Sequence, residues 1–133
     1  MNKILHNTIK YIFSIFLLLS ALKHLYNIYL AEASIMATGY PEAEAAKFVL
    51  AVLETKFLIP FICFVKIIAS VLIVVPKREQ LGVIIALPYS TGMLMWGIFM
   101  VPSHLLIMSS IFLFNFLLIV ANWKNYKSIL KSN

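Results

Sequence analysis

The sequence contains one cysteine, Cys63, and this scarcity excludes several kinds of chemistry. An intrachain disulfide, a Cys-x-x-Cys redox pair and a thiolate metal cluster all need more than one thiol. The disulfide-forming enzymes of membranes are excluded for the same reason. The sequence also has no Ser-His-Asp set, no carboxylate pair arranged for acid–base chemistry and no glycine-rich phosphate loop. It therefore predicts neither catalytic residues nor a metal site, and it favours a protein that is not an enzyme.

Charged residues are scarce as well. They make up 12% of the chain, whereas a soluble domain carries about 25%. Hydrophobic residues make up 62%, and the mean hydropathy is +0.96. This balance predicts a single integral membrane domain over residues 1–133. The net charge of +6 would suit nucleic acid, but most basic residues flank apolar runs, so we expect a lipid bilayer and no nucleic acid as partner.

Four apolar segments are long enough to cross a bilayer: 9–30, 57–75, 81–101 and 105–122. At 1.5 Å per residue, about 20 helical residues cross a hydrocarbon core about 30 Å thick. The segments must be helices because lipid cannot satisfy free backbone groups. The second and third connections are short, which forces antiparallel neighbours. The predicted fold is therefore an all-α, up-down bundle of four transmembrane helices.

The only long connection, 31–56, is expected to contain an additional amphipathic helix on the outer side. Gly39-Tyr40-Pro41 is typical of a turn, and Pro41, Glu42 and Glu44 form a helix-start signal. Without a break, this helix and the second span would form one helix too long for a single crossing. We expect Pro60 to kink the chain or to separate the two helices.

The distribution of basic residues predicts the orientation. One predicted side has only Lys47 and Lys56. The other side collects seven basic residues: Lys3, Lys10, Lys77, Arg78, Lys124, Lys127 and Lys131. The excess marks the cytoplasmic side, so the sequence predicts a multi-pass protein with both termini in the cytoplasm.

Two lysines inside predicted spans are the strongest indication of function, because a charge at mid-membrane costs about 2.5–3.5 kcal/mol. Lys23 shares a helix face with Asn27, and Lys66 shares one with Ser70. Asn115, at a depth similar to that of Lys66, offers it an acceptor oxygen. Two interpretations remain open. In the first, the lysines are tolerated: Lys23 reaches outward or pairs with Glu32 or Glu54, and Lys66 is neutral or bonds Asn115. In the second, they bind an anion, a quinone carbonyl or a lipid headgroup.

Other polar and aromatic residues in the spans have simpler interpretations. Pro88 should kink the third span, and Trp96 fits either an interfacial belt or a core position. His24 and His104 both lie in the outer half, but no third metal ligand accompanies them. We therefore predict no metal site from the two histidines.

Several sequence elements follow one another in a recognisable order. They are Ser20-Ala21-Leu22-Lys23-His24-Leu25 in the first span, the helix, proline and span between Phe48 and Val75, Leu81 to Pro88 and Phe99-Met100-Val101-Pro102 in the third span, and Tyr126-Lys127-Ser128-Ile129-Leu130. Over nearly the whole chain, this order resembles the DoxX-like family of small four-helix bacterial membrane proteins. The resemblance implies a subunit of the bacterial inner membrane. Some relatives associate with quinone-linked oxidoreductases, and others act as assembly or stress-related factors.

Two positions depart from the family pattern. The position of Lys66 is usually acidic in the family, where it would pair with the first-span lysine, and the position of Gly97 is often histidine. A redox or proton-transfer role that depends on those residues would be lost in this chain.

Two functional hypotheses follow. The first is a non-catalytic subunit or assembly partner of a membrane complex, in contact with other membrane proteins or with copies of itself. The second is a component of an oxidoreductase system that binds a quinone or a similar amphiphile between the spans. The candidate ligand-binding residues are Lys23, Lys66, Asn27, Asn115 and Ser70. No cofactor other than a quinone is expected.

Overall fold

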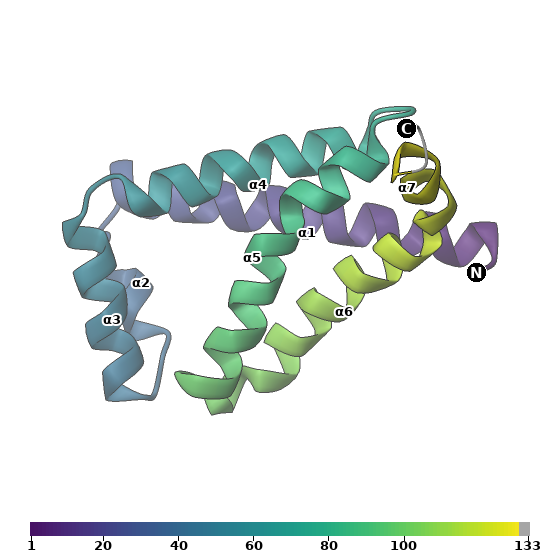
Figure 1. The fold of residues 1–133 in the computed structure, drawn as a ribbon. Helices are drawn as coiled ribbons and strands as arrows, with labels where there is room; N and C mark the ends of the chain where they lie inside the picture. Colours follow the sequence, from purple (N-terminus) through teal and green to yellow (C-terminus); the bar gives the residue numbers. More distant parts are fainter. Residues whose placement is uncertain (131–133) are drawn as a thin grey trace.

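The structure is a computed structural model that describes residues 1–130, and every regular element in that part of the chain is a helix. The predicted all-α class is confirmed. Lys131, which contributed to the charge asymmetry, lies outside the described residues. The elements, shown in Figure 1, are α1 (Lys3–Tyr29), α2 (Ile35–Thr38), α3 (Ala43–Glu54), α4 (Leu58–Val74), α5 (Glu79–Phe99), the 3-10 turn η1 (Pro102–His104), α6 (Leu105–Ala121) and α7 (Trp123–Leu130).

Three helical stretches are long and apolar enough to cross a membrane: Lys3–Tyr29, Glu79–Phe99 and Pro102–Ala121. A fourth crossing exists if α3 and α4 are taken together, although they are bent by 90° at the break between them. Such helices suit a membrane protein. The up-down order of four separate spans stays a prediction.

The break between α3 and α4 lies earlier than the sequence predicted. It falls at residues 55–57, where Lys56 has a φ of 62° and the Leu58 amide donates to Thr55 Oγ1 at 3.3 Å. Pro60, which we expected to form the break, lies in the first turn of α4. Its missing N–H needs no partner there. The left-handed backbone at Lys56 therefore separates the helices, and the proline only begins the second one.

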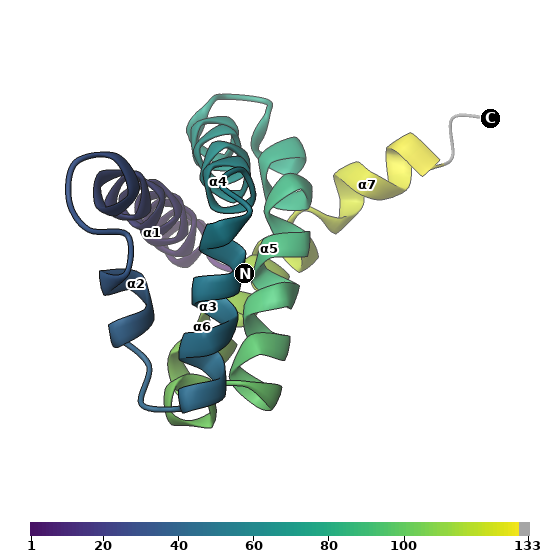
Figure 2. The same ribbon diagram turned by 90° about the vertical axis from the view of Figure 1, so that its left-hand side faces the viewer.

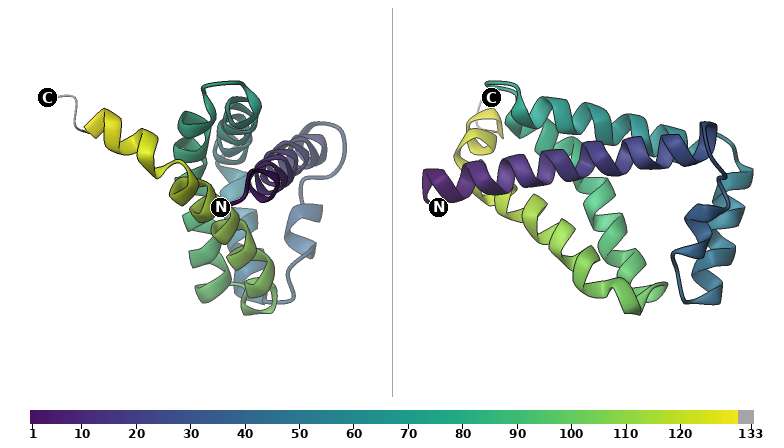
Figure 3. Two further views of the ribbon diagram at one scale, coloured as in Figure 1. Left: turned by 90° about the vertical axis from the view of Figure 1, so that its right-hand side faces the viewer. Right: turned by 180° about the vertical axis from the view of Figure 1, so that it is seen from behind.

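The four longest helices form two pairs that diverge. α1 packs along α4, and α5 packs along α6, with further contacts between α4 and α5. Figure 1 and the right-hand view of Figure 3 show the pairs meeting near the N-terminus and spreading apart toward the opposite end, where α2 and α3 lie. α7 projects away from both pairs (Figure 2 and the left-hand view of Figure 3). The molecule is therefore wedge-shaped, with a closed end and an open end.

The closed end is held by a polar network centred on Glu79, whose side chain is 13% exposed. One carboxylate oxygen lies 2.8 Å from His6 Nε2 and accepts from Asn122 Nδ2 at 2.8 Å. The other lies 3.0 Å from Lys10 Nζ. One acidic side chain thus joins α1, the start of α5 and the end of α6.

Tyr126 extends the closed end to α7. Its hydroxyl donates to the backbone oxygen of Gln80 at 2.9 Å. Burial, together with the nearby negative charge of Glu79, raises the pKa of Tyr126 to about 12. The phenol therefore stays protonated and able to donate throughout the physiological range.

Close backbone approach holds the helices together near this end. A Cβ at Gly82 would lie 2.6 Å from the Ile73 backbone nitrogen and 2.7 Å from the Ala69 oxygen, so only glycine fits between α5 and α4. Ser14 on α1 and Ser70 on α4 each donate to the other's backbone oxygen at 2.9 Å. Small residues and paired hydroxyls are the usual means of packing helices in lipid.

Candidate functional site

A cavity of about 830 Å³ lies where the two helix pairs diverge. This volume is within the range of about 300–1,000 Å³ that is typical of small-molecule sites. Most of its lining is apolar. The polar and aromatic residues that line it are Lys23, His24, Asn27, Tyr40, Phe48, Phe61, Lys66, Tyr89, Trp96 and His104. In the described part of the chain no Asp or Glu lines this cavity.

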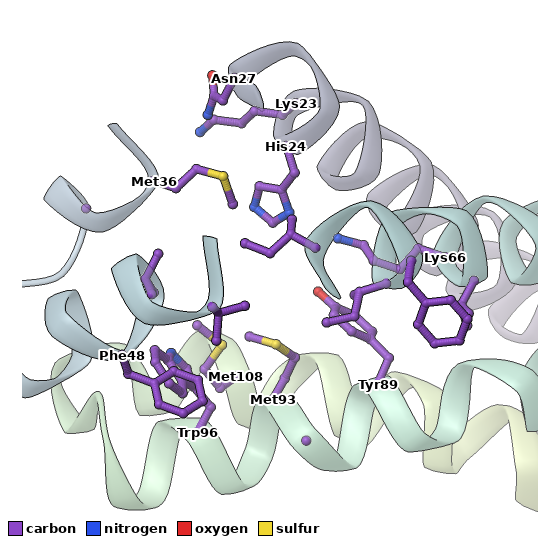
Figure 4. A pocket seen from close by; sticks show the side chains of 18 of the residues that line it. Lys23, His24, Asn27, Met36, Phe48, Lys66, Tyr89, Met93, Trp96 and Met108 are labelled. Atoms are coloured by element: carbon purple, nitrogen blue, oxygen red, sulfur yellow. The ribbon is translucent and has the colours of Figure 1, made fainter. Parts of the chain in front are cut away.

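Lys66 is the most unusual group in the cavity wall. The residue is 1% exposed, and its Nζ has no hydrogen-bond partner among residues 1–130. The nitrogen lies 4.8 Å from the centroid of the Tyr89 ring, which gives it a cation–π contact. An ammonium has three donors, and a ring face satisfies them only in part. Lys66 is thus a buried donor group directed at a cavity (Figure 4).

Lys23 and Asn27 line the same cavity from α1. Asn27 is buried, whereas Lys23 is exposed. Figure 4 shows His24 between Lys23 and Lys66, with its ring pointing toward the space that Lys66 and Tyr89 also face. Three of the five candidate ligand-binding residues therefore line one cavity, and His24 lines it with them.

Ser70 and Asn115 do not line the cavity. Ser70 bonds Ser14 at the interface of α1 and α4. Asn115 Nδ2 donates to the Val83 oxygen at 3.1 Å, and its Oδ1 has no partner among the described residues. The expected bond between Lys66 and Asn115 is wrong. Equal depth in two helices does not bring side chains together, because the rotation of each helix decides what it faces.

The mouth of the cavity at the open end of the wedge is built from aromatic rings of four different segments. The ring of Trp96 lies with its centroid 5.6 Å from that of Tyr40 and 5.1 Å from that of Phe48. The Tyr40 and His104 centroids are 5.8 Å apart. Each of these four residues was named from the sequence in a separate context, and they were not grouped. No local pattern could reveal the cluster, because its members come from a loop, α3, α5 and η1.

Glu42 closes this mouth on one side. The Ser103 amide donates to Glu42 Oε1 at 3.1 Å, which joins the start of α3 to η1. This hydrogen bonding from Ser103 lowers the pKa of the Glu42 carboxyl, and nearby His104 lowers it further. α2 and α3 thus form a cover over the cavity that is attached by polar and aromatic contacts.

The chemistry available in the cavity is recognition of an acceptor group. Although His24 and His104 both line it, no group of three His, Cys, Asp or Glu side chains in residues 1–130 is arranged to hold a metal ion. Cys63 is buried and is not in the lining. Lys66, His24 and Tyr89 can donate hydrogen bonds to one head group, and the apolar wall can hold a hydrocarbon body.

Comparison with protein-family models, with curated proteins and with solved structures gives no match to this chain.

Proposed function

We propose that this protein is an integral membrane protein that binds an amphiphile in the cavity between its helix pairs. The observation that carries the proposal is Lys66, a buried amine without a hydrogen-bond partner in the described chain, at the wall of a large and mostly apolar cavity. Leaving such a group unpaired is unfavourable. A ligand with an acceptor oxygen, such as a quinone carbonyl, a carboxylate or a phosphate, would relieve that penalty.

The resemblance to DoxX-like proteins supports the same proposal, since some of those relatives associate with quinone-linked oxidoreductases. It also supports a place in the bacterial inner membrane. The seven-to-two asymmetry of basic residues favours termini in the cytoplasm. The open end of the wedge, with Glu42 and the aromatic mouth, would then face outward.

Organic extraction tests the proposal. The protein is purified in mild detergent as wild type, Lys66→Met and Ser70→Ala, and each extract is analysed by mass spectrometry. An amphiphile should be recovered from wild type and from Ser70→Ala, because Ser70 lies outside the cavity. Lys66→Met should elute as a monodisperse protein with little or no ligand. Recovery of the same ligand from Lys66→Met would contradict the assigned role of Lys66.

The second candidate is a non-catalytic subunit or assembly partner. The observation in its favour is α7, which leaves the body of the molecule (Figure 2) and offers Trp123, 50% exposed, as a contact. Recovery of partner proteins, or of a second copy of the chain, in mild detergent should fall when the chain is truncated after Asn122. Unchanged recovery would remove α7 from the contact.

A further inference from the structure

The wall of the cavity carries basic side chains, two lysines and two histidines. Lys66 contributes from α4, Lys23 and His24 from α1, and His104 from η1. None of the cavity-lining residues within 1–130 is acidic. Coulombic interactions between such groups are strong where water is scarce. An unfilled cavity therefore brings basic groups together with no counter-charge from its own wall.

The donors converge on one region. Figure 4 shows the Lys66 amine, the His24 ring and the Tyr89 hydroxyl pointing into the same part of the cavity. Lys66 and Tyr89 are already in contact, with the amine 4.8 Å from the ring centroid. A head group with two or more oxygens can accept from several of these donors together. Hydrogen bonds between charged partners are about twice as strong as neutral ones.

The rest of the cavity suits a flexible chain. Met36, Met93 and Met108 reach it from α2, α5 and α6, and Figure 4 shows their side chains around its centre. Methionine adapts to irregular apolar shapes, because its thioether side chain rotates freely and is polarizable. A hydrocarbon tail among the methionines would place its head beside Lys66.

We propose that the occupant carries an acidic head, a carboxylate or a phosphate, on a long apolar chain, and that Lys66 is its main contact. This inference rests on the proposed function, because it specifies which amphiphile the cavity holds. An acid supplies the missing negative charge, whereas a neutral quinone supplies acceptor oxygens only. The preference for an acid over a neutral molecule of the same shape is therefore the quantity to measure.

The chain carries a fluorescent reporter for this measurement. It has two tryptophans; Trp96 lines the cavity, and Trp123 lies on α7 at the closed end. Trp123→Phe leaves Trp96 as the only tryptophan, and Trp96→Phe is the matched control. Each protein, in nanodiscs of zwitterionic lipid, is titrated with 9,10-dibromostearic acid, its methyl ester and a brominated acyl lysophosphatidic acid. Bromine quenches a nearby tryptophan.

The acid should quench Trp96 saturably and bind about tenfold or more tightly than its methyl ester, as expected for one charge-assisted bond. Trp123 in the control protein should show no saturable quenching. In Lys66→Met the ratio of the two affinities should fall toward one, while Ser70→Ala should keep it. Tighter binding of the lysophosphatidic acid than of the fatty acid would support the acidic head and identify it as a phosphate.

Equal affinity for acid and methyl ester in the parent protein would overturn the acidic head and leave amphiphile binding intact. That comparison uses two ligands on one protein, so it holds even if Lys66→Met fails to fold. Absence of saturable quenching by all three brominated ligands, together with organic extracts free of any amphiphile, would overturn the proposed function as well.

Discussion

The two ends of this molecule treat their polar groups in opposite ways. At the closed end, Glu79 is bonded by His6, Lys10 and Asn122, and every contact measures 3.0 Å or less. At the open end, three buried polar atoms have no partner in the described chain: Lys66 Nζ, Trp96 Nε1 and Glu42 Oε2. Both regions lie within or beside apolar helices. Under the proposed function, the closed end provides stability and the open end receives the ligand.

The positions of the acidic residues underlie this contrast. Glu79 is the only acidic residue at the closed end, and the four others lie between residues 32 and 54. A buried charge is tolerated when it is paired and is costly when it is alone. Lys10 has its counter-ion, whereas Lys66 has only the face of Tyr89. Substitutions that remove the paired carboxylate of Glu79 or the unpaired amine of Lys66 test this comparison most directly.

The largest effect on stability is expected from removing the ion pairs of Glu79 at the closed end. Glu79→Gln removes the charge that holds Lys10 and His6, and it should lower the free energy of unfolding by about 3 kcal/mol, as for a broken, mostly buried ion pair. Unfolding in mixed micelles measures this change in the free energy of unfolding. The matched control is Glu54→Gln at the exposed end of α3, which should change stability by less than about 0.5 kcal/mol. Similar losses in both variants would contradict the closed-end assignment.

The same substitution, glycine to alanine, at two positions of α5 compares the packing at the two ends of the molecule. Gly82→Ala should destabilise by about 2 kcal/mol, because its Cβ meets the backbone of α4 at 2.6 Å. Gly92 lines the cavity, and a Cβ there meets nothing within 4 Å. Gly92→Ala should therefore stabilise by up to about 1 kcal/mol through helix propensity. The same unfolding assay compares them, and equal effects would mean that α5 is not packed more tightly at the closed end.

At the open end, Lys66→Met should raise the free energy of unfolding by about 1 kcal/mol, since replacing a buried, unpaired charge by an apolar side chain is neutral or stabilising. Ligand binding should be lost at the same time. Lys23→Met is the matched control, because Lys23 is exposed and its replacement should leave stability nearly unchanged. A clear loss of stability in Lys66→Met, measured without ligand, would show that Lys66 supports the fold.

The smallest effect concerns the cover. Hydrogen bonding from Ser103 lowers the pKa of Glu42, so this contact stabilises the closed cover above the ordinary carboxyl pKa and is lost as pH falls through the lowered value. Acrylamide quenching of Trp96, measured in Trp123→Phe, should rise over that acidic range. His104 lies near the same carboxylate, and its positive charge favours the ionised form of Glu42.

Glu42→Gln is the control for the cover, because the amide cannot ionise. Acrylamide quenching of Trp96 in this variant should therefore be the same at neutral and acidic pH. A parallel acid-induced rise in both proteins would show that Glu42 does not hold the cover.

Much of the local structure was predictable. The apolar runs became helices because lipid-facing backbone has no alternative, and α3 begins near Pro41, Glu42 and Glu44 as expected. The bend before α4 was expected but was assigned to Pro60. Its actual position depends on Lys56 at a φ of 62°, which no residue preference for lysine would suggest.

Part of the cavity was visible in the sequence as well. Lys23, Asn27 and Lys66 were selected because polar groups within spans seldom face lipid, and all three line one cavity. Ser70 and Asn115 satisfied the same criterion and lie in packing interfaces instead. Helical spacing identifies a polar face, but it does not say whether that face meets another helix or an open space.

The sequence by itself determined the helices, their apolar character and the presence of uncompensated lysines within them, because each of these follows from side-chain type and spacing along one segment. Only the tertiary structure decided that the helix pairs meet at Glu79 and diverge at Lys66, and that Tyr40, Phe48, Trp96 and His104 gather at one mouth. Those features depend on the rotation and crossing of helices far apart in the chain, which are set by close contacts such as Gly82 against α4.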